Sequence, residues 1–255
     1  MNDFIFKIVS YNAHKGFNIS NTKFVLAKMR SALIDVNADV LLLQEIQGQH
    51  KYKKFKTALY PAEPDYIYLA KNNWPYYVYG KNAIYDYAHH GNAILSKFAI
   101  NFWQNINVTT NKSASRSILH SIISATNKKN KIHIICIHLG LFKRERLKQL
   151  HILIDMVNEQ ILPHEPVIIA GDFNDWRIHL DAHLSEKLNM QEVFTYTHGK
   201  HAKTFPAHKP MLKTDRIYFR NLDLVKAQIL NQEPWKKLSD HIPLFAEFKL
   251  TGKQQ

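Results

Sequence analysis

The hexapeptide AGDFND, residues 170–175, constrains the fold of this chain more than any other segment. It directly follows an apolar run with the length and composition of a buried β-strand. Polar groups at the end of such a strand need water, a metal ion or a reacting group, because burying them unpaired costs free energy. Asp172 and Asn174 alternate with Phe173, so we expect both polar side chains to face one pocket and Phe173 to pack into the core. We expect Asp175 to face away from that pocket as a turn or capping residue.

Apolar runs of strand length recur along the chain, whereas few segments have helical periodicity. The predicted strands cover residues 4–12, 38–45, 91–96, 115–124, 131–141, 166–175, 214–219 and 241–250. One predicted helix follows Asn21, which we expect to cap it, and a long one has an apolar face from Leu147 to Ile161. Many strands with few helices predict a layered α/β sandwich rather than a doubly wound parallel sheet. Because the sequence has no Gly/Ser-rich linker and no repeat, we expect a single domain over residues 1–255.

The polar residues at the strand ends are almost all Asp, Glu, Asn and His. They are Asn12, Glu45, His138, Asp172 with Asn174, Asp215, and the pair Asp240–His241. One such residue is ordinary, because loops begin at strand ends and meet solvent. Six such positions, rich in oxygen ligands and titratable imidazoles, instead predict that the strand ends converge on one polar pocket.

Such a pocket suits phosphate chemistry assisted by a divalent cation. Mg²⁺ prefers oxygen ligands and keeps several waters, so the carboxylate of Glu45 and the carboxamide of Asn12 are sufficient to hold it. The sequence has no GK[ST] phosphate loop, no HExxH and no GxSxG, which argues against an NTPase, a zincin and a serine nucleophile on an elbow. The lone Cys136 excludes an intramolecular disulfide and a cysteine-based zinc cluster. Metal-assisted attack of water on phosphorus remains, with His and Asp in acid–base roles.

Seven motifs, in their order along the chain, resemble those of the endonuclease/exonuclease/phosphatase superfamily, which has the DNase I-like fold. They are SYNAHKG, LLLQEI, HHGNAILSK, CIHLGL, AGDFND, TDRIYF and LSDHIPL. The resemblance spans about residues 5 to 250, and the ordered pair GDFN and SDH is its most specific part. The N-x-H-K-G pattern near the start resembles a bacterial subgroup. The resemblance implies a four-layer α/β sandwich of two packed mixed β-sheets flanked by helices, with the site at their common rim.

The resemblance also implies which residues bind a metal ion and the substrate. Asn12 and Glu45 match the metal-binding pair, and Asp240 lies near the metal. The implied ion is Mg²⁺, with Mn²⁺ as a second candidate. Arg116 resembles a substrate-contacting arginine, and we expect Lys15, three residues after Asn12, to reach the substrate.

The remaining matches imply catalytic roles. Asp172 and Asn174 would orient or activate the attacking water and hold the phosphoryl group. His241 would act as acid, base or phosphate donor, and Asp215 would hydrogen-bond to it. His138 would donate to the phosphate. Which of Asp172 and a histidine is the base stays open.

Net charge points to polyanionic partners. The chain has 34 Lys and Arg against 21 Asp and Glu, which gives a formal charge of +13. On this ground we expect a nuclease-type phosphodiesterase acting on DNA or RNA. The basic clusters at residues 51–56, 127–131, 143–148 and 235–237 either contact phosphates or form solvated surface.

Two alternatives stay open. Abasic-site endonucleases of this superfamily commonly have tyrosine where this chain has His138, whereas secreted DNases, sphingomyelinases and inositol-phosphate phosphatases have histidine. A lipid or inositol-phosphate phosphoesterase is therefore the alternative function. A catalytically idle binding module is the third hypothesis, because folds can keep their architecture and lose their chemistry.

The first residues carry no classical export signal, because charges at Asp3 and Lys7 interrupt a short apolar stretch. No window approaches the ~20 apolar residues of a membrane span. We therefore expect a cytoplasmic protein, with non-classical secretion left open. The sequence does not indicate the oligomeric state.

Overall fold

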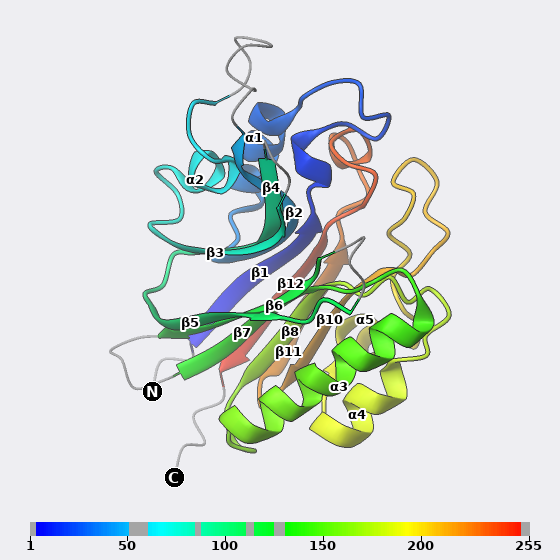
Figure 1. Cartoon of the computed structure of the whole chain (residues 1–255). Helices are drawn as coiled ribbons and strands as arrows, with labels where there is room; N and C mark the ends of the chain where they lie inside the picture. Colours follow the sequence, from blue (N-terminus) through cyan, green and yellow to red (C-terminus); the bar gives the residue numbers. More distant parts are fainter. Residues whose placement is uncertain (1–3, 51–60, 85–87, 111–114, 125–130, 251–255) are drawn as a thin grey trace.

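The computed structural model describes residues 4–50, 61–84, 88–110, 115–124 and 131–250 (Figure 1). Within these residues, two six-stranded mixed sheets pack face to face, and helices cover their outer sides. The expected four-layer sandwich is confirmed.

Each sheet contains six strands whose spatial order differs from their order in the chain. The first sheet runs from β11 (Asp223–Ile229) through β12 (Leu244–Leu250), β1 (Phe4–Asn12), β2 (Val40–His50) and β4 (Ala88–Ser96) to β3 (Tyr76–Ile84). The second runs from β5 (Ile100–Asn107) through β6 (Ser117–Ser124), β7 (Lys131–His138), β8 (Val167–Asp172) and β10 (Asp215–Arg220) to β9 (Gln191–Glu192). The pairs β1–β2 and β7–β8 are parallel, and the other neighbours are antiparallel.

The helices form the outer layers. α1 (Leu26–Val36) and α2 (Asp65–Ala70) cover the first sheet, and α3 (Lys143–Gln160) and α4 (Asp181–Leu188) cover the second (Figure 1). α5 (Val193–His198) follows β9, and two short 3₁₀ turns, η1 (His14–Gly16) and η4 (Trp235–Lys237), lie in the loops. No helix in the described part of the chain is long and apolar enough to cross a membrane.

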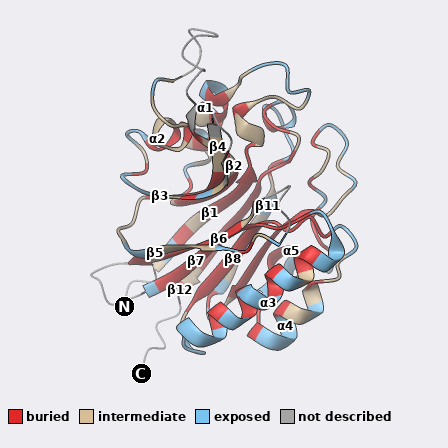
Figure 2. Ribbon diagram, viewed as in Figure 1, coloured by how far each residue is buried: buried red, intermediate tan, exposed pale blue. Residues whose placement is uncertain are grey.

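Alternation along the strands divides the core into three clusters. Ile8 of β1 packs between the sheets with Ile134 and Ile168, whereas its neighbour Val9 packs outwards under α1. This follows from the two-residue period of a strand, which sends successive side chains to opposite faces. Both faces of the central strands are therefore buried, as the red strands of Figure 2 show.

The two parallel pairs decide where the polar strand ends lie. Parallel neighbours end at the same edge of a sheet, so Asn12 of β1 lies beside Gln44 of β2, and His138 of β7 lies beside Asp172 of β8. Antiparallel β10 begins at this edge, which puts Asp215 beside Asp172. The carboxyl ends of both parallel pairs thus form one rim.

Expectations about three individual residues had different outcomes. Phe173 is fully buried, as expected. Asn21 does not cap α1, which begins at Leu26; the preceding loop is instead closed by Asn18, whose Oδ1 accepts hydrogen bonds from Thr22 N and Lys23 N at 2.8 and 2.9 Å. Asp175 does hold a turn, but it is also a buried acid.

The carboxylate of Asp175 is the centre of a buried charge cluster that the sequence did not indicate. It accepts a hydrogen bond from Leu180 N and forms ion pairs with Arg146 at 3.5 Å and Arg216 at 3.3 Å. Removing one partner of such a cluster leaves an uncompensated buried charge, which costs about 3–5 kcal/mol. The turn after β8 is therefore fixed from behind.

The structure also locates part of the basic clusters. Arg146 is buried, so the cluster 143–148 is not simply a solvated helix face. The cluster 235–237 forms η4, in which Lys236 and Lys237 are exposed. Residues 51–56, and residues 127–130 of the cluster 127–131, lie outside the described residues.

Gly171 is the glycine on which the rim depends. Its φ is +149°, and a Cβ built there would lie 1.9 Å from the carbonyl oxygen of Ile137 on the adjacent strand.

We predict that Gly171→Ala lowers the free energy of unfolding by about 3 kcal/mol or more, through overpacking and backbone strain. Gly199→Ala is the matched control, because Gly199 also has positive φ but nothing within 4 Å of the added Cβ. It should cost only about 1 kcal/mol. Equal losses in urea denaturation would contradict the close-packing explanation.

Candidate active site

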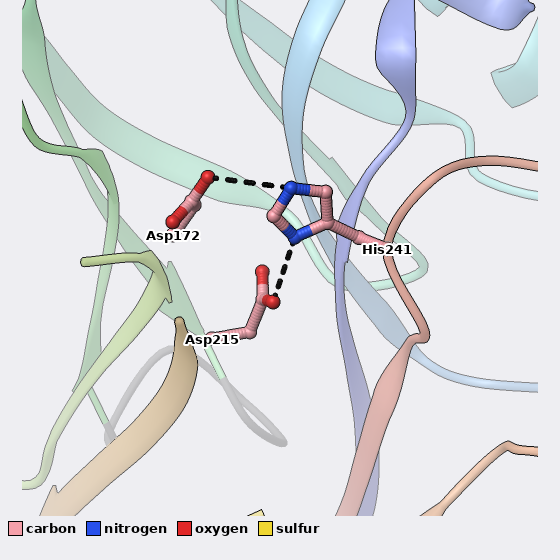
Figure 3. Close-up of side chains that lie close together, drawn as sticks. All are labelled: Asp172, Asp215 and His241. Atoms are coloured by element: carbon pink, nitrogen blue, oxygen red, sulfur yellow. Dashed lines mark hydrogen bonds and ion pairs between the residues drawn. The ribbon is translucent and has the colours of Figure 1, made fainter. Parts of the chain in front are cut away.

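A buried histidine between two aspartates occupies the rim (Figure 3). His241 Nδ1 donates to Asp215 Oδ2 at 2.8 Å, and its Nε2 lies 3.7 Å from Asp172 Oδ2. The three residues come from β8, from the start of β10 and from the loop before β12. The expected hydrogen bond between Asp215 and His241 is therefore present.

Two threonines fix the Asp215 carboxylate. Thr204 Oγ1 and Thr214 Oγ1 donate to Asp215 Oδ2 at 2.5 and 2.9 Å. The same oxygen accepts the hydrogen bond from His241, so three donors fix its position. Thr214 could have been suspected from its place beside Asp215. Thr204 carries no local signal, because the tertiary fold alone brings its loop to the rim.

His241 is charged at neutral pH. Burial opposes protonation of the ring, but the carboxylates of Asp215 and Asp172 outweigh it and raise the pKa of His241 to about 10. The ring of Phe205 packs against the imidazole with the ring centres 4.9 Å apart. The site thus holds an oriented imidazolium.

Asp172 lies where the two sheets meet. Its Oδ1 accepts from Asn174 N at 2.9 Å, and its Oδ2 accepts from Asn12 Nδ2 at 3.1 Å. Burial raises the pKa of Asp172 to about 7, against the opposing effect of the His241 charge. A carboxylate with a pKa near neutrality can take up and release a proton at working pH.

The second site histidine is in the opposite state. His138 Nε2 lies 3.6 Å from Asp172 Oδ2, and burial together with the charge of Arg116 lowers the pKa of His138 well below its usual value. His138 is therefore neutral. Arg116 is held beside it, since Arg116 Nε donates to Leu139 O at 3.2 Å, the same oxygen that accepts from Asn174 Nδ2 at 2.9 Å.

Glu45, Asn12 and Asp240 form the oxygen-rich side of the site. Burial opposes ionisation of Glu45, but the positive charge of Lys15 beside it favours the carboxylate and lowers the pKa of Glu45. Lys15 Nζ lies 3.4 Å from Glu45 Oε2, so Lys15 contacts the expected metal ligand. Asp240 Oδ1 lies 3.2 Å from His14 Nδ1, and Asn12 Oδ1 accepts from His14 N at 3.1 Å.

These oxygens fit a hard divalent cation. Glu45 Oε2 is buried and, among the described residues, accepts no hydrogen bond, so a carboxylate oxygen lies in the interior with only the ion pair to Lys15. Asp172, Asp215 and His241 are also close enough together to suggest a metal site. That cluster fits a metal poorly, because His241 is protonated and its Nδ1 is engaged with Asp215.

Several residues at the rim have a left-handed backbone. His14, Lys15, Glu45 and Asn174 have φ of 44°, 57°, 53° and 51°. Such conformations are costly for residues other than glycine and concentrate at functional sites. At Glu45 the cause is visible, because the pairing of β2 with β4 shifts register between Leu43 and Ile46. The bulge re-aims the Glu45 side chain.

The structure brings all ten expected residues to this rim and adds Ser239, His14 and His90. Ser239 Oγ donates to Asn12 O at 2.7 Å and accepts from His241 N at 3.2 Å, which ties the SDH segment to β1. His14 contacts Asp240. Burial of the His90 ring lowers its pKa to about 4, although the negative charge of the nearby Glu45 acts to raise it. His14 and His90 each lie within one of the seven motifs. The sequence alone does not show that they lie near the other site residues.

Comparison with known proteins assigns the family. The model of the Endonuclease/Exonuclease/phosphatase family matches residues 9–241. The chain belongs to this family. Members of this family hydrolyse phosphoester bonds, and the chain is an enzyme of that class.

Curated sequences and solved structures agree with that assignment. The chain is 40% identical over 248 residues to the uncharacterized protein YbhP of Escherichia coli K12, covering 97% of each. An endonuclease/exonuclease/phosphatase structure from Beutenbergia cavernae superposes with a TM-score of 0.76 at 14% identity, covering 97% of this chain and 72% of that one. D. rerio TDP2, solved with a single-strand DNA product, gives 0.69 at 19% identity and covers 96% and 98%. At these identities the two structures show the shared fold.

The Asp215–His241 pair is predicted to act as a unit. Asp215→Asn should lower kcat, because it removes the charge that keeps His241 protonated, and should move the basic limb of the pH–rate profile to lower pH. His241→Ala should cost more, and the double variant should cost little beyond His241→Ala alone. Steady-state kinetics of the four proteins test this. Strictly multiplicative losses would show that the two residues work independently.

The same pair should make stability depend on pH. The folded pKa of His241 is raised to about 10 from an unfolded value of ~6.5, so its stabilisation is fully present below the unfolded pKa and is lost as pH rises through the folded pKa. We predict that the stability difference between wild type and Asp215→Asn shrinks steadily from about pH 6.5 to 10. Urea denaturation across this range measures it, and a constant difference would contradict the assigned charge.

Proposed function

We propose that the chain is a Mg²⁺-dependent phosphodiesterase in which water attacks phosphorus at the rim where the parallel strand pairs end. The observation that carries this proposal is the geometry of one buried site, in which His241 is hydrogen-bonded to Asp215 at one ring nitrogen and faces the Asp172 carboxylate with the other. The cationic His241 and the near-neutral pKa of Asp172 supply an electrostatic donor and a proton acceptor 3.7 Å apart.

Asp172 is the proposed proton acceptor for the attacking water. Its pKa near 7 matches that task, and its hydrogen bonds from Asn12 and Asn174 fix the carboxylate in one orientation. The imidazolium of His241 would stabilise the charge that develops on the phosphoryl oxygens, since a preoriented donor in a buried site costs no reorganisation. Neutral His138 and the guanidinium of Arg116 would bind the same oxygens.

Asn12, Glu45 and Asp240 are the residues that would hold Mg²⁺, with Mn²⁺ as a second candidate. Bound there, the ion would offset the negative charge of the phosphodiester. In the structure, the positive charge beside Glu45 comes from Lys15, whose ammonium group forms an ion pair with the Glu45 carboxylate. We expect Lys15 to turn to the substrate when the ion binds.

Two substrate classes fit this chemistry. Nucleic acid is supported by the charge of +13 and by the fold shared with TDP2, whose structure contains single-strand DNA. A lipid phosphodiester is supported by apolar side chains exposed beside the site, at Leu141, Phe142 and Trp176. Hydrolysis of plasmid DNA, RNA, sphingomyelin, phosphoinositides and phosphatidylglycerol, with Mg²⁺ and with EDTA, compares them directly. If no phosphoester in this panel is hydrolysed, the proposal fails and the idle binding module gains support.

Glu45→Gln tests the metal assignment. The substitution keeps the shape but removes the negative charge, so we predict a fall in activity of about a hundredfold or more, on the order of 3 kcal/mol, and weaker Mg²⁺ binding. Isothermal titration with Mg²⁺ measures the second effect without turnover. Lys97→Gln, which removes one partner of a half-buried ion pair with Asp39, is a control for charge loss elsewhere. Unchanged activity and unchanged Mg²⁺ affinity would refute the role of Glu45.

A further inference from the structure

Three large apolar side chains project into solvent beside the active site. Leu141 is 57%, Phe142 66% and Trp176 41% exposed. We call them the rim patch. We propose that the rim patch docks the enzyme on an anionic lipid surface, so that the phosphodiester it cleaves belongs to a lipid headgroup. This inference rests on the proposed phosphodiesterase function.

The rim patch lies on the two segments that leave the catalytic strands. Leu141 and Phe142 follow β7 three and four residues after His138, and Trp176 follows β8 four residues after Asp172. The segments touch each other at their bases, because Leu139 N donates to Asp172 O at 2.9 Å. A surface that covers the rim patch would therefore lie against the two segments that directly follow His138 and Asp172.

Buried polar contacts hold the rim patch in place. Arg146 Nη1 donates to Leu141 O at 2.6 Å, its Nη2 pairs with Asp175, and its guanidinium lies 5.7 Å from the centre of the Trp176 ring. Gln149 Oε1 accepts from Gly140 N at 2.8 Å. Arg146 and Gln149 of α3 thus hold the backbone of both segments, so the apolar side chains are kept exposed by buried contacts.

The charges around the rim patch favour an anionic partner. The exposed charged residues of segments 141–144 and 176–177 are Lys143, Arg144 and Arg177, all of them positive. The neighbouring acids are withdrawn from the surface: Glu145 and Asp175 are buried. Apolar side chains flanked by Lys and Arg are typical of protein surfaces that bind anionic membranes.

The side-chain types favour lipid over nucleic acid. Single-stranded nucleic acids are bound by stacking bases on flat aromatic rings, to which the aliphatic Leu141 adds nothing. In a lipid interface Leu and Phe both bury apolar area, and Trp is favoured at the boundary with the headgroups. Net charge attracts both polyanions equally and does not separate them.

Vesicle binding tests the inference. Sedimentation with phosphatidylglycerol vesicles should capture the wild-type protein, and phosphatidylcholine vesicles should capture much less. Leu141→Gln with Phe142→Gln should weaken binding to the anionic vesicles about tenfold or more, because two apolar side chains no longer enter the interface. Lys143→Glu with Arg144→Glu should weaken it as well, and added salt should remove the remaining difference between the two lipids.

The control is Trp103→Ala on β5, which removes a large apolar side chain that is 50% exposed but lies outside the rim patch. It should leave vesicle binding unchanged. Hydrolysis of bis(p-nitrophenyl) phosphate in solution should stay within about twofold of wild type in the Leu141/Phe142 variant, whereas release of headgroups from vesicles should fall with binding.

Four results would overturn the inference or the function beneath it. Absence of vesicle binding, or an equal loss in Trp103→Ala, overturns the inference. So does a loss of binding to a single-stranded oligonucleotide in the Leu141/Phe142 variant with vesicle binding unaffected, which would make the rim patch a nucleic-acid surface. If wild type does not hydrolyse bis(p-nitrophenyl) phosphate with Mg²⁺ or Mn²⁺, the proposed function fails independently of the vesicle result.

Discussion

The hydrogen bond from Asn12 to Asp172 joins the two sheets at the point where both of their parallel strand pairs end. It links residues 160 positions apart in the chain, and both partners are buried. The other site contacts depend on this meeting point, because Asp172 also lies within 4 Å of His138 and His241, at 3.6 and 3.7 Å. A sandwich whose sheets were offset by one strand would separate these groups.

This arrangement gives the two histidines of the site different charges. Two buried histidines lie within 4 Å of the same Asp172 oxygen, yet His241 is cationic and His138 is neutral. Burial alone would make both neutral. The difference arises because His241 has Asp215, fixed by two threonines, on its far side, whereas His138 has Arg116 as its charged neighbour.

Much of this protein could be predicted from sequence. The apolar runs predicted eight of the strands that the structure describes, each to within five residues, since β-branched residues with a two-residue period are a local signal. They did not predict β3, β5, β9 and β11, which are the edge strands of the two sheets. The positions of β5 and β11 are exposed or half-buried, so these strands carry no continuous apolar run. The polar strand ends and the motifs around them predicted ten residues that meet at the rim, and they predicted the family. What failed locally was Asn21, because Asn18 satisfies the backbone of that loop and α1 starts later without a side-chain cap.

Tertiary structure alone decided three further properties. Thr204 meets Asp215 only because its loop folds back on the rim. The left-handed backbone at Glu45 arises from a register shift between strands that are far apart in sequence. The exposure of Leu141, Phe142 and Trp176 depends on what packs below them. Sequence determines which groups are available and, through period and strand ends, the sheet edge they reach. Their protonation, strain and exposure depend on distances to residues elsewhere in the chain, and only packing sets those distances.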